Sequence, residues 1–132
     1  MTIASFAIPV PKLAWKNATG EQVASKILEA HRFAKLDQYR ATTHNKGIMN
    51  GVDAVAVALG QDWRAIESAA HSYAALSGKY SPLSDYRVAD GVLHGRIELP
   101  IAVGTKGGAI QTHSSYINTH MIMGFPTAVE IA

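Results

Sequence analysis

Residues 86–99, which read YRVADGVLHGRIEL, are the stretch that decides the fold class. The dipeptide Asp90-Gly91 stands between two β-prone runs, and this pattern is the strongest short-range signal for a β-hairpin. In the second run Leu93, Ile97 and Leu99 share one face, while polar side chains take the other face. Because helical segments precede this hairpin, the sequence predicts an α+β fold of helices followed by a β-hairpin.

Two helices with clear start signals come before the hairpin. Thr19 followed by Gln22 fits a capping box, and apolar residues then recur at helical spacing to about Leu36. Asp62 is a good N-cap for a second helix that runs through Leu76.

The segment between these helices is divided into a loop and a buried run. Residues 37–47, DQYRATTHNKG, are polar, lack periodicity and predict a loop. Residues 52–59 form an Ala/Val-rich run that favours a buried helix ended by Gly60, with a buried strand as the competing interpretation.

The two ends of the chain give weaker signals. Residues 5–13 are β-prone but contain two prolines, which predicts an edge strand or an extended connector. The glycine-rich segment 104–108 lacks the spacing of a phosphate loop and favours a tight turn or a close backbone approach. A short helix is expected around residues 116–123. Trp15 and Trp63 are expected to be packing residues.

Composition excludes several classes of protein. The chain has 132 residues, 48% hydrophobic and 17% charged, which is typical of one globular domain. A formal charge of +2 is too small an excess to indicate nucleic-acid binding, and the absence of cysteine excludes a disulfide scaffold, a thiolate zinc site and a cysteine nucleophile. No apolar run is long enough to span a membrane and no secretion signal is evident, so a soluble, cytoplasmic protein is expected.

The richest chemistry lies in the polar segment that ends at Gly51. Arg40, Lys46 and Asn50 gather there just before an apolar helix, an arrangement that suits an anionic ligand or a developing oxyanion. A solvated loop is the alternative that composition alone favours. Asp62 is either a helix cap or a carboxylate brought back beside Lys46 by one helix and a turn. The scattered histidines, His113 and His120 included, lack the spacing of a metal site.

Two longer runs then carry a resemblance to a known family. Tyr39 to Tyr80 reads YRATTHNKGIMNGVDAVAVALGQDWRAIESAAHSYAALSGKY, and Gly91 to Ala109 reads GVLHGRIELPIAVGTKGGA. The motifs HNKGIMNG and GQDWRA are highly specific. From about Ser5 to Ala132 the sequence resembles 3-hydroxy-3-methylglutaryl-coenzyme A (HMG-CoA) reductase, in the class II form found in bacteria and archaea.

The resemblance implies roles for particular residues. Lys46 would be the catalytic lysine that polarises the thioester carbonyl, and Asp62 the catalytic aspartate that hydrogen-bonds it. Arg40 and Asn50 match positions that contact the HMG moiety. Gln61 stands where class II members more often have asparagine.

The resemblance also implies what the chain lacks. The family reduces HMG-CoA to mevalonate with NADH or NADPH, releases coenzyme A and assembles its sites at a dimer interface. Its catalytic glutamate, its cofactor domain and its C-terminal histidine motif have no match here. Residues 1–18 are therefore expected to be a connector or edge strand leaving the cofactor domain, and residues 19–132 a segment of the large, substrate-binding domain with the catalytic loop.

Three functions are compatible with that incomplete set. The first is a fragment of the reductase that is inactive alone and pairs with the missing parts or with a second copy. The others are a non-catalytic module that binds HMG or CoA, or pairs with a reductase, and an inactive truncated product.

Overall fold

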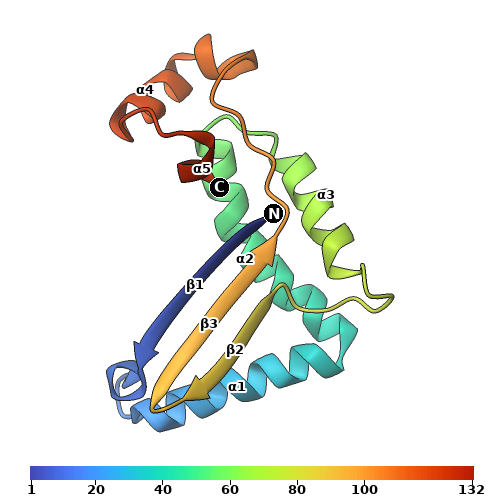
Figure 1. The fold of residues 1–132 in the computed structure, drawn as a ribbon, viewed down its shortest axis with the longest axis vertical. Helices are drawn as coiled ribbons and strands as arrows, with labels where there is room; N and C mark the ends of the chain where they lie inside the picture. The colour runs from blue at the N-terminus through green and yellow to red at the C-terminus, as the bar shows by residue number, and fades with distance from the viewer.

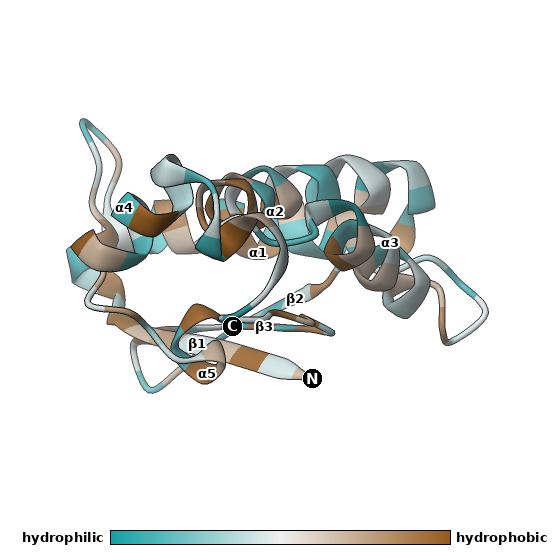
Figure 2. Cartoon of the chain, turned by 90° about the horizontal axis from the view of Figure 1, so that it is seen from above, coloured by the Kyte–Doolittle hydropathy of each residue, from teal (hydrophilic) through white to brown (hydrophobic).

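A computed structural model describes residues 1–132 and shows helices covering one face of a small antiparallel sheet (Figures 1 and 2). The elements, in chain order, are β1 (Thr2–Pro9), η1 (Val10–Leu13), α1 (Gly20–Leu36), α2 (Gln38–Ala58), α3 (Trp63–Ala74), β2 (Ser84–Ala89), β3 (Val92–Leu99), η2 (Gly108–Gln111), α4 (Ser114–Ile122) and α5 (Ala128–Ile131). The α+β prediction is confirmed, and the strand β1 precedes the helices. No helix is both long and apolar enough to cross a membrane.

The predicted hairpin is present as β2 and β3, which pair antiparallel from Ser84↔Ile97 to Ala89↔Val92. Asp90 and Gly91 both have positive φ, 51° and 72°, as the two central residues of a type I′ turn require. Leu93 and Leu99 are buried. The hydrophobic alternation of the second strand therefore faces the helices, as predicted.

β1 lies at the edge of the three-stranded sheet, whose order is β1-β3-β2. It pairs with β3 along its whole length, from Thr2↔Leu99 to Pro9↔Val92. The predicted edge strand therefore exists, but it begins earlier than residue 5 and ends at Pro9. Residues 10–13 form the 3₁₀ turn η1, since a proline at position 11 cannot donate to a strand ladder.

α1 and α3 begin where their caps predict. Thr19 and Gln22 form a full capping box, with the Thr19 N–H donating to Gln22 Oε1 at 2.9 Å and the Gln22 N–H donating to Thr19 Oγ1 at 3.3 Å. The Asp62 side chain caps α3, which ends at Ala74, two residues before the predicted Leu76.

α2 is one continuous helix over residues 38–58, so the prediction of a loop over residues 37–47 is wrong. The strand interpretation of residues 52–59 is also wrong. Asp37 caps the helix, because its carboxylate accepts a hydrogen bond from the Arg40 N–H at 2.7 Å. The candidate residues Arg40, Lys46 and Asn50 therefore lie within a helix and not before its N-terminus. The free N–H groups of a helix N-terminus thus give no support for an anion site beside Lys46 and Asn50.

A buried amide explains why the periodicity of α2 was hidden. Ala41, Asn45 and Met49 follow one another at a spacing of one turn and are fully or almost fully buried. The Asn45 amide donates to Ser81 O at 2.9 Å, and its oxygen accepts from the Leu83 N–H at 2.9 Å. An asparagine thus occupies a core position where the hydrophobic pattern requires an apolar residue.

The core lies between α2, α3 and the sheet. Its buried residues are Met49, Ala56, Ile66, Ala70, Ala74, Leu83 and Leu99. The predicted C-terminal helix is found as α4. Segment 104–108 has no strand or helix before η2 begins at Gly108, in keeping with the predicted turn. Trp15 and Trp63 are both exposed, at 69% and 39%, and the prediction that they are packing residues is wrong for Trp15.

Candidate functional site

Lys46 and Asn50 are presented together on α2. They are four residues apart, which places them one turn apart on the same side of the helix, and both are exposed. Lys46 takes part in none of the ion pairs of the chain. An ammonium group and a carboxamide therefore share an open surface and are free to contact a polar ligand.

Arg40 lies on a neighbouring side of the same helix. It precedes Lys46 by six residues, which corresponds to a rotation of roughly 120° about the helix axis. Its side chain is half-buried, and its charge acts on His44 one turn later. The structure therefore places Arg40 beside the exposed Lys46 side of α2 but not within it.

Asp62 lies at the corner between α2 and α3. One carboxylate oxygen, Oδ1, accepts from the Ala65 N–H at 3.1 Å, and the residue is exposed. The other oxygen has no hydrogen-bond partner in the chain. The cap that the sequence predicts is therefore present, with one acceptor left over.

Lys46 and Asp62 do not meet within one chain. Ala56 is ten residues beyond Lys46 in α2, or about 15 Å along the helix axis. The Gln61 N–H is bound to Ala56 O at 2.8 Å, which holds Asp62 at that far end. A continuous helix thus separates the two side chains that the resemblance pairs.

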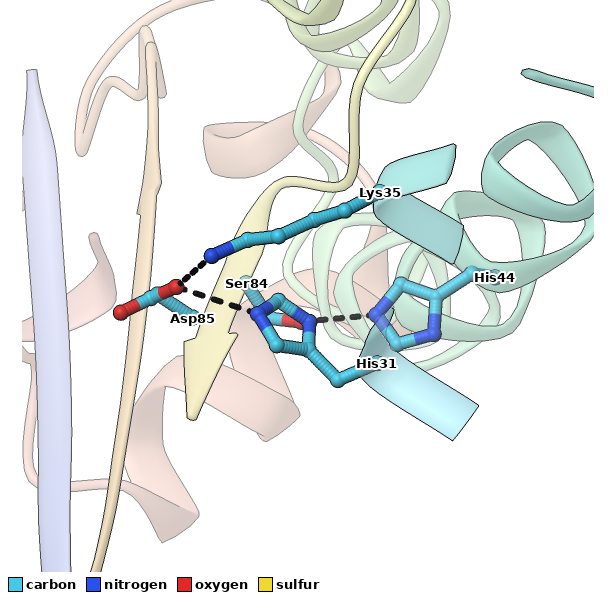
Figure 3. Close-up of polar contacts among 5 residues, drawn as sticks. All are labelled: His31, Lys35, His44, Ser84 and Asp85. Atoms are coloured by element: carbon cyan, nitrogen blue, oxygen red, sulfur yellow. Dashed lines mark hydrogen bonds and ion pairs between the residues drawn. The ribbon is translucent and has the colours of Figure 1, made fainter. Parts of the chain in front are cut away.

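A polar cluster that the sequence did not predict lies between α1, the N-terminal half of α2 and β2 (Figure 3). From α1, His31 Nε2 lies 3.0 Å and Lys35 Nζ 2.5 Å from Asp85 Oδ1. From α2, His44 Nε2 lies 2.7 Å from Ser84 Oγ. These contacts fasten both helices to consecutive residues of β2. His31 and Lys35 stand one helical turn apart, but nothing in the sequence shows that they converge on a strand 50 or more residues later.

The cluster also shifts two ionisation equilibria. The hydrogen bond from Lys35 lowers the pKa of Asp85, and the bond from His31 adds to this effect, while burial of the carboxyl opposes it. The pKa of His44 is lowered by burial, by the charge of Arg40 and by His31. The ring centroids of His31 and His44 are 6.4 Å apart. The charge of Arg40, the candidate substrate-binding arginine, therefore acts on a histidine that lies next to a second one.

Other polar features lie away from the predicted residues. A cleft of about 440 Å³ is lined by the ion pairs Lys35–Asp85 and Arg96–Glu98, but by none of the four predicted site residues. No three His, Asp or Glu side chains converge as metal ligands would. His120 is buried with Nε2 3.1 Å from Leu59 O, whereas His113 is exposed.

Comparisons with known proteins give a consistent result. The family model for hydroxymethylglutaryl-coenzyme A reductase matches residues 2–132. The 3-hydroxy-3-methylglutaryl-coenzyme A reductase of Archaeoglobus fulgidus is 49% identical over 86% of this chain, and the probable reductase of Borreliella burgdorferi is 44% identical over 76%. The chain spans only 26% and 23% of the lengths of these two relatives.

The solved structures agree with the sequence relatives. The reductase of Streptococcus pneumoniae is 41% identical and superposes with a TM-score of 0.93, over 98% of this chain and 31% of its own. A structure of the class II reductase from the same organism, bound to NADPH in open conformations, is also 41% identical, covers 98% of this chain and 32% of its own, and has a TM-score of 0.92.

Proposed function

The chain belongs to the hydroxymethylglutaryl-coenzyme A reductase family, and from that premise we propose that it is the part of a reductase that binds the HMG moiety and stabilises charge on the thioester carbonyl. The reaction would be the reduction of HMG-CoA to mevalonate, or the reverse. The observation that carries the proposal is the exposed pair of Lys46 and Asn50 on one side of α2.

Lys46 would supply the cation of the site. Its helical backbone restricts where the ammonium group can lie, and no carboxylate of the same chain neutralises it. A preorganised cation directed at a developing oxyanion contributes a rate factor on the order of 10²–10³. The substrate carbonyl oxygen would therefore be its partner.

Arg40 and Asn50 would hold the HMG moiety. A guanidinium group can bind a carboxylate through two parallel hydrogen bonds, which suits the free carboxylate of HMG. The Asn50 carboxamide, next to Lys46, would donate to an oxygen of the same moiety. Arg40, Lys46 and Asn50 would thus bind the two ends of one short, anionic substrate.

Asp62 would reach Lys46 from a second copy of the chain. The two residues are separated along α2, and Ala54 lies midway between them in the sequence. A two-fold axis near Ala54 would set two α2 helices antiparallel and bring each Lys46 to the partner's Asp62. The exposed side of α2 carries Gly47 and Gly51, at which an added Cβ would meet no atom, so close approach of a second helix is possible. We therefore propose a homodimer with shared sites.

The nicotinamide cofactor does not fit this chain. Neighbouring strands of the sheet are all antiparallel, so the sheet has no adjacent parallel strands of the kind that form a dinucleotide-binding βαβ unit. The glycine-rich segment 104–108 leads into a four-residue 3₁₀ helix, which lacks the long helix N-terminus that binds a pyrophosphate. In the proposed reductase, NADH or NADPH would be bound by other residues of the assembly.

A chimeric enzyme tests the proposal. The matching segment of the Archaeoglobus fulgidus reductase is replaced by this chain, and HMG-CoA-dependent oxidation of NADH and NADPH is followed by absorbance. We expect an active chimera, in which Lys46→Ala lowers kcat by about 100-fold or more while Lys26→Ala, an exposed lysine on α1, leaves it unchanged.

Two results would contradict the proposal. One is retention of most of the activity by the Lys46→Ala chimera. The other is turnover by the isolated chain, since the proposal places the nicotinamide site in other residues of the assembly. A folded but inactive chimera that binds HMG-CoA would favour the non-catalytic binding module instead.

A further inference from the structure

The side chain of Gln61 forms an unusual link between distant parts of the chain. Gln61 is 9% exposed and lies in the turn between α2 and α3. Its Nε2 donates to Gly104 O at 2.7 Å, and its Oε1 accepts from the Gly104 N–H at 2.9 Å. One residue of a β-ladder offers its partner the same donor and acceptor pair. The side-chain amide of Gln61 therefore forms with the Gly104 backbone the two hydrogen bonds that a residue of a neighbouring strand would form.

This link is important because the segment after β3, whose Ile101 and Val103 pack against the core, has no other hydrogen bonds. Residues 100–107 form no backbone–backbone hydrogen bond, and their side chains form none either. The two bonds from Gln61 are the hydrogen bonds that tie this segment to the helices. Gly104 and the exposed Lys106 are thereby held at the end of α2.

The same side chain restrains Asp62, the next residue. The Gln61 N–H binds Ala56 O at 2.8 Å, and its carbonyl accepts from the Trp63 N–H at 3.0 Å. Together with the Gly104 bonds, these contacts use every polar group of Gln61. Asp62 therefore follows a residue that is fixed on both its backbone and its side chain, and from that backbone position its cap bond to the Ala65 N–H gives the free carboxylate oxygen a defined direction.

We propose that Gln61 is a positioning residue for Asp62, and that its bonds to Gly104 set the direction of the carboxylate and hold segment 104–108 beside it. This role rests on the proposed function of Asp62. In this chain the Gln61 amide suits the role because it both donates and accepts at a reach that spans from the turn to Gly104.

Nuclear magnetic resonance on the intact chain tests the proposal. We expect Gln61→Leu to raise the exchange rate of the Gly104 amide about tenfold or more and to turn the single Asp62 χ1 rotamer, measured by three-bond couplings, into an average. Gln38→Leu makes the same chemical change at an exposed glutamine of α2 and is expected to alter neither.

A second variant separates positioning from simple loss of packing. In Gln61→Glu the ionised carboxylate cannot donate to Gly104 O, whereas the protonated acid, below a pH of about 4, can donate and accept as the amide does. We expect the Gly104 protection factor and the Asp62 rotamer to be lost at neutral pH and restored by acid. This comparison remains decisive if Gln61→Leu fails to fold.

Two outcomes would overturn the proposal: an unchanged Asp62 rotamer when Gly104 is released, or unchanged Gly104 exchange in Gln61→Leu. Both are read without turnover. An inactive chimera would therefore count against the proposed function and leave the positioning role of Gln61 to be decided by these spectra.

Discussion

Replacing Asn45 by leucine is expected to cost the fold about 1–4 kcal/mol. The Asn45 side chain is fully buried and satisfies Ser81 O and the Leu83 N–H, each at 2.9 Å. Leucine has a similar shape but leaves both backbone groups without a partner, at about 1–3 kcal/mol each. Burial of the added apolar surface returns roughly 1–2 kcal/mol.

Urea unfolding followed by far-ultraviolet circular dichroism measures this loss. Asn50→Leu makes the same change at an exposed position of α2 and is expected to alter the free energy of unfolding by no more than about 0.5 kcal/mol. Asn45→Asp retains the acceptor for Leu83 but places a carboxylate oxygen against Ser81 O, so it should also destabilise. A loss below about 1 kcal/mol for Asn45→Leu, with an unchanged m-value, would refute the reasoning.

Three further predictions follow from the same geometry. Lys46→Ala and Asp62→Ala chimeras are each expected to be inactive, whereas their co-expressed mixture should recover about a quarter of the wild-type activity. About half of the dimers are then mixed, and one of the two shared sites in each mixed dimer is intact. No recovery would place both residues in one chain. Burial, more than the charge of Arg40 or His31, lowers the pKa of His44, so the folded state favours the neutral imidazole. The unfolded chain then binds the proton more readily, and the free energy of unfolding should fall as the pH drops below about 6.5. His44→Gln should flatten this pH dependence, measured by thermal unfolding between pH 7 and 5. Gly60→Ala should lower stability by about 1–2 kcal/mol, because φ is +69° and the new Cβ would lie 3.0 Å from the Tyr116 ring, and an unchanged melting temperature would contradict this.

The parts of the fold that sequence predicted are those whose signals are local. The Asp90-Gly91 turn and the Thr19–Gln22 capping box each depend on residues within a few positions of one another. Their backbone conformations follow from short-range sterics and hydrogen bonds. These features set the hairpin, the start of α1 and, through Asp62, the start of α3.

The N-terminal half of α2 was missed because its signal is not local. The partners of Asn45 are 36 and 38 residues away in the sequence. Without them, a polar residue at a core position is evidence against a helix. Only the folded chain shows that the amide is buried and fully bonded.

The same limit applies to the surroundings of the candidate site. The motifs HNKGIMNG and GQDWRA point to Lys46 and Asp62, since they stand within a few residues of specific neighbours. The contacts that orient the surrounding structure are long-range: His31 meets Asp85 across 54 residues, and Gln61 meets Gly104 across 43. A single sequence contains no information that pairs such positions.

The helical state of residues 38–58 changes the nature of the proposed site. A flexible loop would have allowed Lys46 to fold back onto Asp62 within one chain. A continuous helix does not, since it fixes the lysine about 15 Å along the axis from the turn that carries the aspartate. If the two residues act together, as the family resemblance implies, the proposed homodimer provides a contact between them that a single chain does not. The exposed glycines of α2 then have a physical role, because a side chain at either position would hold the second helix further away.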